Sequence, residues 1–390
     1  MFFKTLIVFI GMCSIVSAQS FNTFLDKALK NSPYLQANAL VLQRSAQEAK
    51  LLQRYKNPTL SLEFSDFRPD GGNSDTGYRM AVIQPLRLWG IADDKKALAD
   101  ASMEESKEYV SLQRAAFVKK LSLLYIDYVA QSESVTLAQE ELLIAQKITE
   151  ISKERYVAGT IAKIKYYQTK VDLLSAKNSV AAKKIIKLSA YYRLLGFAGS
   201  KDDENISLKH RFQLNIKTDF ATSTQLKYIK SRQNRAAKEA LLYGNKVEWF
   251  NLFAEYEKEP QQKIARVGVD IPLALFNTKT QEKKLAQIEV KKQQYMLKNR
   301  ALSLHNSYKQ LTQELHSLEA LLDATEELYA SQKELLGMYE DGYKIANINL
   351  MELQNMKNKM IQTRKRAIAL QKKIDTDIVL YNYETGAYNE

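Results

Sequence analysis

The sequence is poor in the residues that interrupt helices or cross-link chains. Its 390 residues include one cysteine, 13 glycines and six prolines. The cysteine, Cys13, lies in an N-terminal segment that we expect to be removed, so the mature chain can form neither a disulfide nor a thiolate metal site. The prolines leave two long proline-free stretches, from residue 86 to 259 and from residue 273 onward, where helices can run without interruption.

Residues 1–18 predict a signal peptide. Lys4 is positive, the run from Leu6 to Val16 is apolar, and Val16-Ser17-Ala18 is a small-residue cleavage site. The alternative, a membrane anchor, would require a longer apolar run. No long apolar run follows, so any insertion into a membrane has to come from amphipathic strands. We therefore expect an exported protein of a Gram-negative bacterium.

The net charge of +13 does not indicate nucleic-acid binding, because lysine and glutamate are interleaved along the predicted helices. The sequence contains no nucleophile elbow, phosphate-binding loop or metal-ligand cluster. Its three histidines, His210, His305 and His316, are scattered. We therefore expect neither an enzyme nor a catalytic, metal or cofactor site.

One short motif occurs twice, about half the chain apart. Gln84 to Gly90 reads QPLRLWG and Ile271 to Asn277 reads IPLALFN. Each copy ends an alternating run at a proline, continues to an aromatic residue and leads into a long helical pattern. This repetition predicts one structural unit written twice.

Alternation of apolar and polar residues predicts four strands. Leu60, Leu62 and Phe64 alternate with polar residues, which is typical of a half-buried strand. We place the strands at about 59–66, 77–85, 248–257 and 263–272. Leu60 and its neighbours would form one apolar face and the intervening residues a polar face.

Three–four spacing of apolar residues predicts two long helical hairpins, at about 92–195 and 278–385. Tyr156-Val157-Ala158-Gly159-Thr160 and Tyr339-Glu340-Asp341-Gly342-Tyr343 break the patterns and are the expected tips. Residues 19–199 then form a first repeat, 200–222 a polar linker and 223–390 a second repeat.

Four strands cannot close a barrel, and an open sheet cannot lie in lipid. Three protomers would supply twelve strands. The predicted fold is mainly α-helical with a small membrane β part: a trimeric 12-stranded barrel, four strands per protomer, continued by a long periplasmic α-helical barrel of coiled-coil hairpins.

These features together resemble the TolC family of outer-membrane efflux proteins. Asn57-Pro58 before the first strand, the two Pro-Leu junctions and the Tyr-x-x-Gly tips follow the family order. The run from Val269 to Asn277 is similar to the CzcC-like heavy-metal branch, although Ala274 stands where that branch has a second proline. The resemblance implies a passive homotrimeric duct, set in outer-membrane lipid, that receives heavy-metal cations from an inner-membrane pump through a periplasmic membrane-fusion adaptor.

Alternatives remain: a multidrug or protein-exporting duct of the same family, or a periplasmic coiled-coil adaptor. An adaptor would have one hairpin flanked by glycine-rich halves, whereas this chain predicts two hairpins and four strands.

The resemblance also implies the site residues. The tips would contact the adaptor and form the entrance, through Tyr156, Gly159, Thr160, Tyr339, Gly342 and Tyr343. Charged residues beside them are gate candidates: Arg155, Glu340 and Asp341. In a trimer, tips from three copies would alternate cationic and anionic groups around the entrance, and these opposite charges could hold a closed state. The strand-to-helix junctions are marked by Pro85, Trp89, Pro272 and Phe276.

Overall fold

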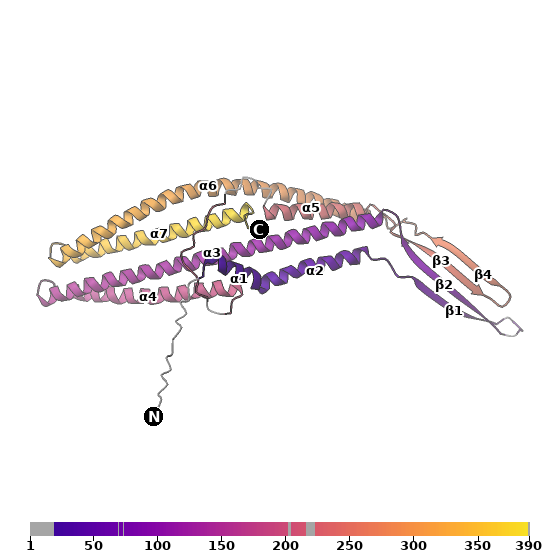
Figure 1. Cartoon of the computed structure of the whole chain (residues 1–390), viewed down its shortest axis with the longest axis horizontal. Coiled ribbons are helices and arrows are strands. Elements are labelled where there is room, and N and C mark those ends of the chain that lie inside the picture. The colour runs from indigo at the N-terminus through magenta and orange to yellow at the C-terminus, as the bar shows by residue number, and fades with distance from the viewer. Residues whose placement is uncertain (1–18, 69, 73, 202–203, 216–222, 389–390) are drawn as a thin grey trace, which may run out of the picture. The chain divides into compact units, whose positions relative to one another are not determined.

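The chain is described from a computed structural model, which covers residues 19–68, 70–72, 74–201, 204–215 and 223–388. The predicted signal peptide, residues 1–18, and parts of the predicted linker lie outside the described residues. The elements within these ranges follow one another in the order shown in Figure 1: α1 Phe21–Asn31, α2 Pro33–Gln53, β1 Thr59–Phe67, β2 Asp75–Arg87, α3 Ile91–Val157, α4 Lys163–Ala198, α5 Thr224–Leu242, β3 Trp249–Lys258, β4 Lys263–Asp270, α6 Thr280–Lys344 and α7 Leu350–Glu384.

The length of α3 and α6 follows from the distribution of proline. The two helices have 67 and 65 residues and lie in the proline-free stretches. Where a proline occurs near a helix, it stands at an end. α1 stops at Asn31, and Pro33 is the first residue of α2, a position where its missing N–H costs nothing.

The chain divides into two compact units, and each draws on both halves of the sequence. The described residues of the first unit fall in 19–35, 116–215 and 308–383, and those of the second in 36–115, 223–307 and 384–388. The division into two consecutive sequence repeats therefore stays a prediction, separate from this spatial division.

The first unit is helical. One core cluster joins α1 to α3 and α4 through Phe21, Phe117 and Leu194, all 2% exposed or less. A second joins α3, α6 and α7, with Ile148, Leu336 and Leu353 among its members. Burial on this scale, roughly 1.5–3 kcal/mol for each large apolar side chain, stabilises the packing of the hairpins.

The second unit contains the sheet and the helical segments next to it. All four strands are antiparallel to their neighbours and lie in the order β1-β2-β3-β4 (Figure 1). Leu62 is paired with Met80 and Leu252 with Val269, so the apolar residues of neighbouring strands share one face. The Arg235 guanidinium binds Glu105 at 2.5 Å and joins α5 to α3.

Three element ends differ from the sequence predictions. β2 continues through Pro85 to Arg87, which is possible because β1 pairs with β2 only as far as Ile83 and leaves one edge of β2 without a partner there. β4 ends at Asp270, before Ile271 and Pro272. α6 continues to Lys344, past the predicted break. No helix among the described residues is both long enough and apolar enough to cross a membrane.

Candidate functional site

The tips of the two helical hairpins are joined in the first unit by Arg155 and Tyr343. Nη1 of Arg155, near the end of α3, donates a hydrogen bond to the backbone carbonyl of Tyr343 on α6 at 2.7 Å. The guanidinium also lies 4.6 Å from the centre of the Tyr343 ring. The hydroxyl of Tyr343 is 2.8 Å from Oγ of Ser152, and this contact is buried. Arg155 therefore fixes α3 to α6 rather than standing free at a turn.

Glu340 has a different partner from the one its sequence position suggests. We expected it beside the tip, where opposite charges such as that of Arg155 would face it. Instead its carboxylate binds Nζ of Lys147 at 2.5 Å, one helical turn or more from the tip, and Glu340 is 8% exposed. This hydrogen bond raises the pKa of Lys147 above its ordinary value. This ion pair is a second contact between α3 and α6.

Asp172 and Lys357 form a third link, between α4 and α7. Nζ of Lys357 lies 2.5 Å from a carboxylate oxygen of Asp172, and the lysine side chain is only 2% exposed. Sequence reasoning missed this pair. A signal was present, because Lys357 lies four residues from both Leu353 and Ile361 on the apolar stripe of α7, where a lysine needs a partner.

The first tip matches the sequence prediction of a turn at glycine. Gly159 has φ +73°, the left-handed conformation that glycine adopts without strain, and nothing would meet a Cβ there. Oγ1 of Thr160 donates to the Arg155 carbonyl at 3.0 Å, closing the end of α3. The rings of Tyr156 and Tyr166 stack across the turn with centroids 5.6 Å apart.

The second tip lies further along the chain than predicted. Tyr339, Glu340, Asp341, Gly342 and Tyr343 are all helical, and the turn comprises residues 345–349.

Two features explain the shift. Ala346, not Gly342, adopts positive φ, at 69°, whereas a Cβ on Gly342 would lie 2.6 Å from Cγ1 of Ile348. Asn349 then caps α7: its Oδ1 accepts from the Glu352 N–H at 3.0 Å, and Glu352 accepts from the Asn349 N–H. This capping box was the sequence signal that could have located the turn. Gly342 is needed for space rather than for backbone freedom.

The tip residues differ in accessibility. Tyr343 is 1% exposed, and Tyr339 is partly buried against the core. Asp341 is exposed on α6. A ring of alternating charges around an entrance would require several copies of the chain and stays a prediction.

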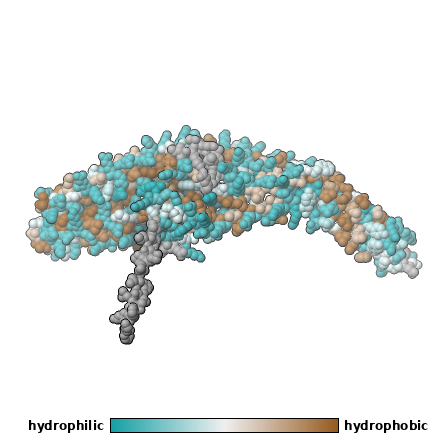
Figure 2. Space-filling view, viewed as in Figure 1, coloured by the Kyte–Doolittle hydropathy of each residue, from teal (hydrophilic) through white to brown (hydrophobic). Residues whose placement is uncertain are grey.

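The sheet of the second unit has two contrasting faces. One is apolar and exposed, as the hydrophobic surface over the strands in Figure 2 shows. Its exposed members come from all four strands: Leu60, Leu62, Phe64, Tyr78, Met80, Val82, Leu252, Tyr256, Val267 and Val269. An exposed apolar surface of this extent marks a membrane or protein contact.

The opposite face carries an ion-pair network. Glu255 on β3 is 8% exposed and binds Arg79 on β2 at 2.5 Å and Arg266 on β4. Arg266 also binds Glu257 at 2.7 Å, and Arg79 lies 3.5 Å from Glu63 on β1. Charged residues thus cross-link all four strands on the side away from the apolar face. Arg266 and the neighbouring Val267 thus lie on opposite faces of β4, as the alternation along a strand requires.

The four predicted junction residues differ in their position relative to the strands. Trp89 and Phe276 are 88% and 99% exposed, on the segments that follow β2 and β4. Pro85 lies within β2 and Pro272 two residues beyond β4. Sequence reasoning missed Arg87, whose side chain is 2% exposed and whose guanidinium contacts the rings of Tyr55 and Trp249, at 4.8 and 4.7 Å from their centres.

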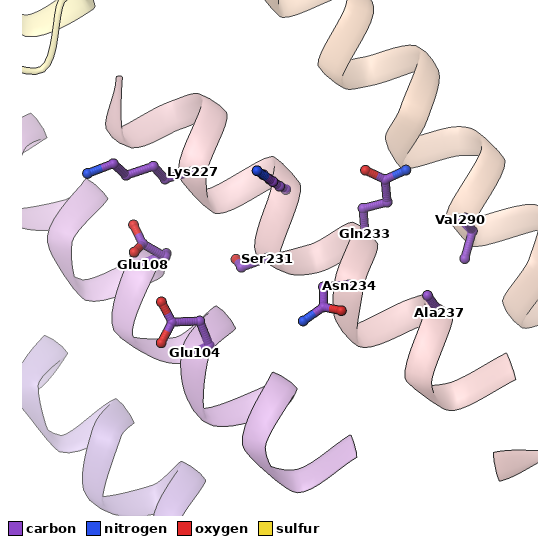
Figure 3. Close-up of a pocket in the computed structure, with 9 residues that line it drawn as sticks. Glu104, Glu108, Lys227, Ser231, Gln233, Asn234, Ala237 and Val290 are labelled. Atoms are coloured by element: carbon purple, nitrogen blue, oxygen red, sulfur yellow. The ribbon is translucent and has the colours of Figure 1, made fainter. Parts of the chain in front are cut away.

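A groove of about 630 Å³ lies on the helices of the second unit (Figure 3). Glu104 and Glu108 on α3 face Lys227 on α5, and Val290 of α6 closes one end. Burial, opposed by nearby Lys227, raises the pKa of Glu108. Within the described residues, no group of three or more histidine, cysteine, aspartate or glutamate side chains is placed to hold a metal ion.

Comparison with known proteins gives a family match over part of the chain and a fold match over nearly all of it. Residues 24–200 match the family described as outer membrane efflux protein. No curated protein matches the sequence.

Three solved structures are similar over most of their length. CusC is 13% identical, with 94% of this chain and 91% of that chain covered and a TM-score of 0.79. The CmeC outer membrane channel of Campylobacter jejuni is 14% identical, with 94% and 85% covered and a TM-score of 0.78. The outer-membrane channel OprN is 11% identical, with 95% and 90% covered and a TM-score of 0.81.

These matches confirm the predicted fold class. The chain has the fold of these outer-membrane channels: mostly helical, with a small four-stranded sheet. The family match covers residues 24–200, and none of these matches distinguishes the heavy-metal branch.

Proposed function

We propose that this protein is the exit duct of a tripartite efflux system, a passive channel from the periplasm through the outer membrane. The observation that carries the proposal is the sheet with an exposed apolar face, an ion-paired opposite face and two open edges. Lipid suits the first face and water the second. The fold match to outer-membrane channels supports the same assignment.

The open edges require more than one protomer. Within the described residues, β1 and β4 each have a strand on one side only. Unpaired backbone groups in lipid cost several kcal/mol each, so the edges have to be paired. Pairing β4 of one protomer with β1 of the next closes a barrel of twelve strands in a homotrimer, with the Glu255 network lining the lumen.

The hairpin tips are the proposed periplasmic entrance and the contact for the adaptor. At the first tip the accessible residues are Tyr156, Val157, Gly159 and Thr160. At the second, the accessible surface is the turn at 345–349 rather than the buried Tyr343. The links Arg155–Tyr343, Lys147–Glu340 and Asp172–Lys357 hold the two hairpins together in what we interpret as the resting arrangement of the entrance.

For the substrate we propose heavy-metal cations delivered by an inner-membrane pump. The similarity of Val269 to Asn277 to the metal-efflux branch supports this substrate class. The lumen-facing network adds a surplus of carboxylates, because Glu63, Glu255 and Glu257 accompany two arginines. A wide duct lined with net negative charge favours cations.

The duct itself is tested on detergent-extracted, full-length protein. We expect a trimer in native mass spectrometry and a shift in gel mobility on heating, as for a membrane barrel. Reconstituted in planar bilayers, it should conduct ions. A water-soluble monomer that forms no pores would contradict the proposal.

A further inference from the structure

Helix α4 carries an exposed apolar seam that is left uncovered within the protomer. Its residues recur at intervals of three and four, the spacing of a coiled-coil seam, in two stretches separated by Asn178 and Ala181. Ile164, Val171 and Leu174 are 66%, 67% and 58% exposed, and Ile185 and Leu188 continue the line at 68% and 53%. We call this line, with Tyr167, the α4 seam.

Lysines follow the α4 seam with a period of seven. All four are exposed: Lys163, Lys170, Lys177 and Lys184. Three of them directly precede an apolar residue of the seam, and Lys177 precedes Asn178 at the equivalent position. A charged residue at this flanking position is what selects the partner in a coiled coil.

Helix α6 carries a second exposed seam with the opposite charge. Leu321, Leu328 and Leu335 are spaced by seven residues and are 39%, 50% and 41% exposed, and Met338 is 59% exposed. We call these four residues the α6 seam. Its flanking position also repeats with a period of seven, and there it is acidic and exposed: Glu327, Glu334 and Asp341.

The two patterns match when the helices pair in antiparallel orientation with their tips at the same level. α4 runs away from its tip and α6 runs toward its own tip, so an antiparallel pair brings the two tips to one end. In that orientation the equivalent flanking positions face each other across the seam. Lys163 then meets Asp341, Lys170 meets Glu334, and Lys177 meets Glu327. The same register stacks Ile164 on Met338, Tyr167 on Leu335 and Leu174 on Leu328.

We propose that the α4 seam of one protomer packs against the α6 seam of the next, forming the contact between protomers in the helical part of the trimer. The proposal rests on the trimeric duct proposed above. Because both seams are exposed in the protomer, they do not cover each other within one chain. Two different surfaces that match each other form a head-to-tail contact, which closes into a ring under rotational symmetry.

The axial positions of the seams fit such a ring. Oγ1 of Thr149 donates to the Thr169 carbonyl, so α3 and α4 are aligned with Lys163 beside Arg155. Arg155 is bonded to the Tyr343 carbonyl, which places Lys163 within about one turn of Asp341 along the helix direction. A three-fold rotation about an axis parallel to the helices does not change a residue's height along that axis. Lys163 of one protomer therefore stays near the height of Asp341 of the next.

Cysteine cross-linking of the full-length protein tests the register, because the predicted mature chain has no cysteine of its own. Leu174→Cys combined with Leu328→Cys places two thiols in one layer, within reach of a disulfide. We expect covalent dimers and trimers on a denaturing gel without reductant, lost on reduction. The matched control, Leu174→Cys with Leu335→Cys, is offset by seven residues, about 10 Å along the helix, and should remain monomeric on that gel.

Charge reversal tests the partner. Lys170→Glu and Glu334→Lys should each lower the temperature at which the detergent-extracted trimer dissociates, and the double variant should restore it. The seam assignment would be overturned if the wild type is a trimer but the Leu174→Cys/Leu328→Cys variant does not cross-link and the charge-reversal double variant does not regain stability. The two faces would then contact an adaptor or line the lumen. A wild-type protein that is not a trimer would instead overturn the proposed duct.

Discussion

Arg155 and Tyr343 join the two hairpins by two contacts of one side chain: a hydrogen bond of 2.7 Å to the carbonyl and a position 4.6 Å from the ring centre. A hydrogen bond from a charged donor contributes about 1.5–3 kcal/mol and a cation–π contact about 0.5–1 kcal/mol. Replacing Arg155 removes both contacts, whereas α3 and α6 themselves remain folded.

Arg155→Ala should therefore raise the single-channel conductance in planar bilayers, because the hairpins at the entrance are released from each other. About 1.4 kcal/mol changes the ratio of open to closed entrances tenfold. Lys153→Ala, an exposed substitution on the same helix, is the control and should conduct like the wild type. Unchanged conductance in Arg155→Ala would show that the constriction lies elsewhere.

Asp341→Asn should weaken the preference of the channel for cations. The proposed trimer would place three such carboxylates near the entrance, and removing them would lower the local concentration of cations. The reversal potential in a salt gradient measures the effect. Glu154→Gln, exposed near the other tip, separates a local effect from a general loss of negative charge. Equal selectivity of Asp341→Asn and wild type would remove Asp341 from the entrance.

Val269→Arg should impair assembly in the outer membrane far more than Asp270→Ala. Val269 is 52% exposed on the apolar face and is paired with Leu252, whereas Asp270 follows on the other face. An arginine facing lipid at mid-membrane costs roughly 2–4 kcal/mol. The amount of heat-dissociable trimer in membranes measures assembly. Similar amounts for both variants would mean that the two faces have been exchanged.

Loss of the protein should sensitise its host to zinc, cadmium, cobalt, nickel or copper ions. The expectation follows from the proposed substrate class and is measured as the growth of a deletion strain over a range of metal concentrations. Restoration by the wild-type chain on a plasmid is the control. Sensitivity restricted to organic drugs or dyes would assign the duct to drug efflux instead.

Asp375→Asn should raise the thermal stability of the helical unit at neutral pH. Burial raises the pKa of Asp375 above its ordinary 3.8, although Arg211 lies 3.7 Å away. The charged form is thus less favourable in the folded than in the unfolded protein. The ionised Asp375 therefore destabilises the folded protein above the folded pKa, and this destabilisation disappears as the pH falls below about 4.

The melting temperature of Asp375→Asn should therefore exceed that of wild type at pH 7, with the difference shrinking toward pH 4. Arg211 keeps a contact to Glu133 at 3.5 Å in the variant, so it is not left unpaired. Asp323→Asn, exposed on α6, should show neither effect. A lower melting temperature for Asp375→Asn would mean that the Arg211 contact outweighs burial.

Local patterns predicted the elements well, because their signals are local. The alternation of Leu60, Leu62 and Phe64 locates β1, and the spacing of proline allows the long helices. The second tip was misplaced because Gly342 was interpreted by analogy with Gly159. A glycine that leaves room for Ile348 and one that adopts positive φ look the same in a sequence.

The contacts that join the hairpins could not be predicted in the same way. Lys147 and Glu340 are far apart in the chain. Each has charged neighbours in the sequence that could equally form the ion pair. Their pairing depends on how α3 and α6 pack, which the periodicity of either helix alone leaves open. The same holds for Glu255, whose two arginines come from different strands.

The unpaired edges of β1 and β4 have a genetic consequence. In the proposed trimer a protomer completes its sheet only with its neighbours, so a defective copy would enter trimers together with normal copies and inactivate them. If half of the protomers in a cell carry an edge or seam defect that still permits mixing, roughly one trimer in eight contains only normal chains. Such alleles should be dominant over the wild-type gene, whereas a simple absence of the protein should be recessive.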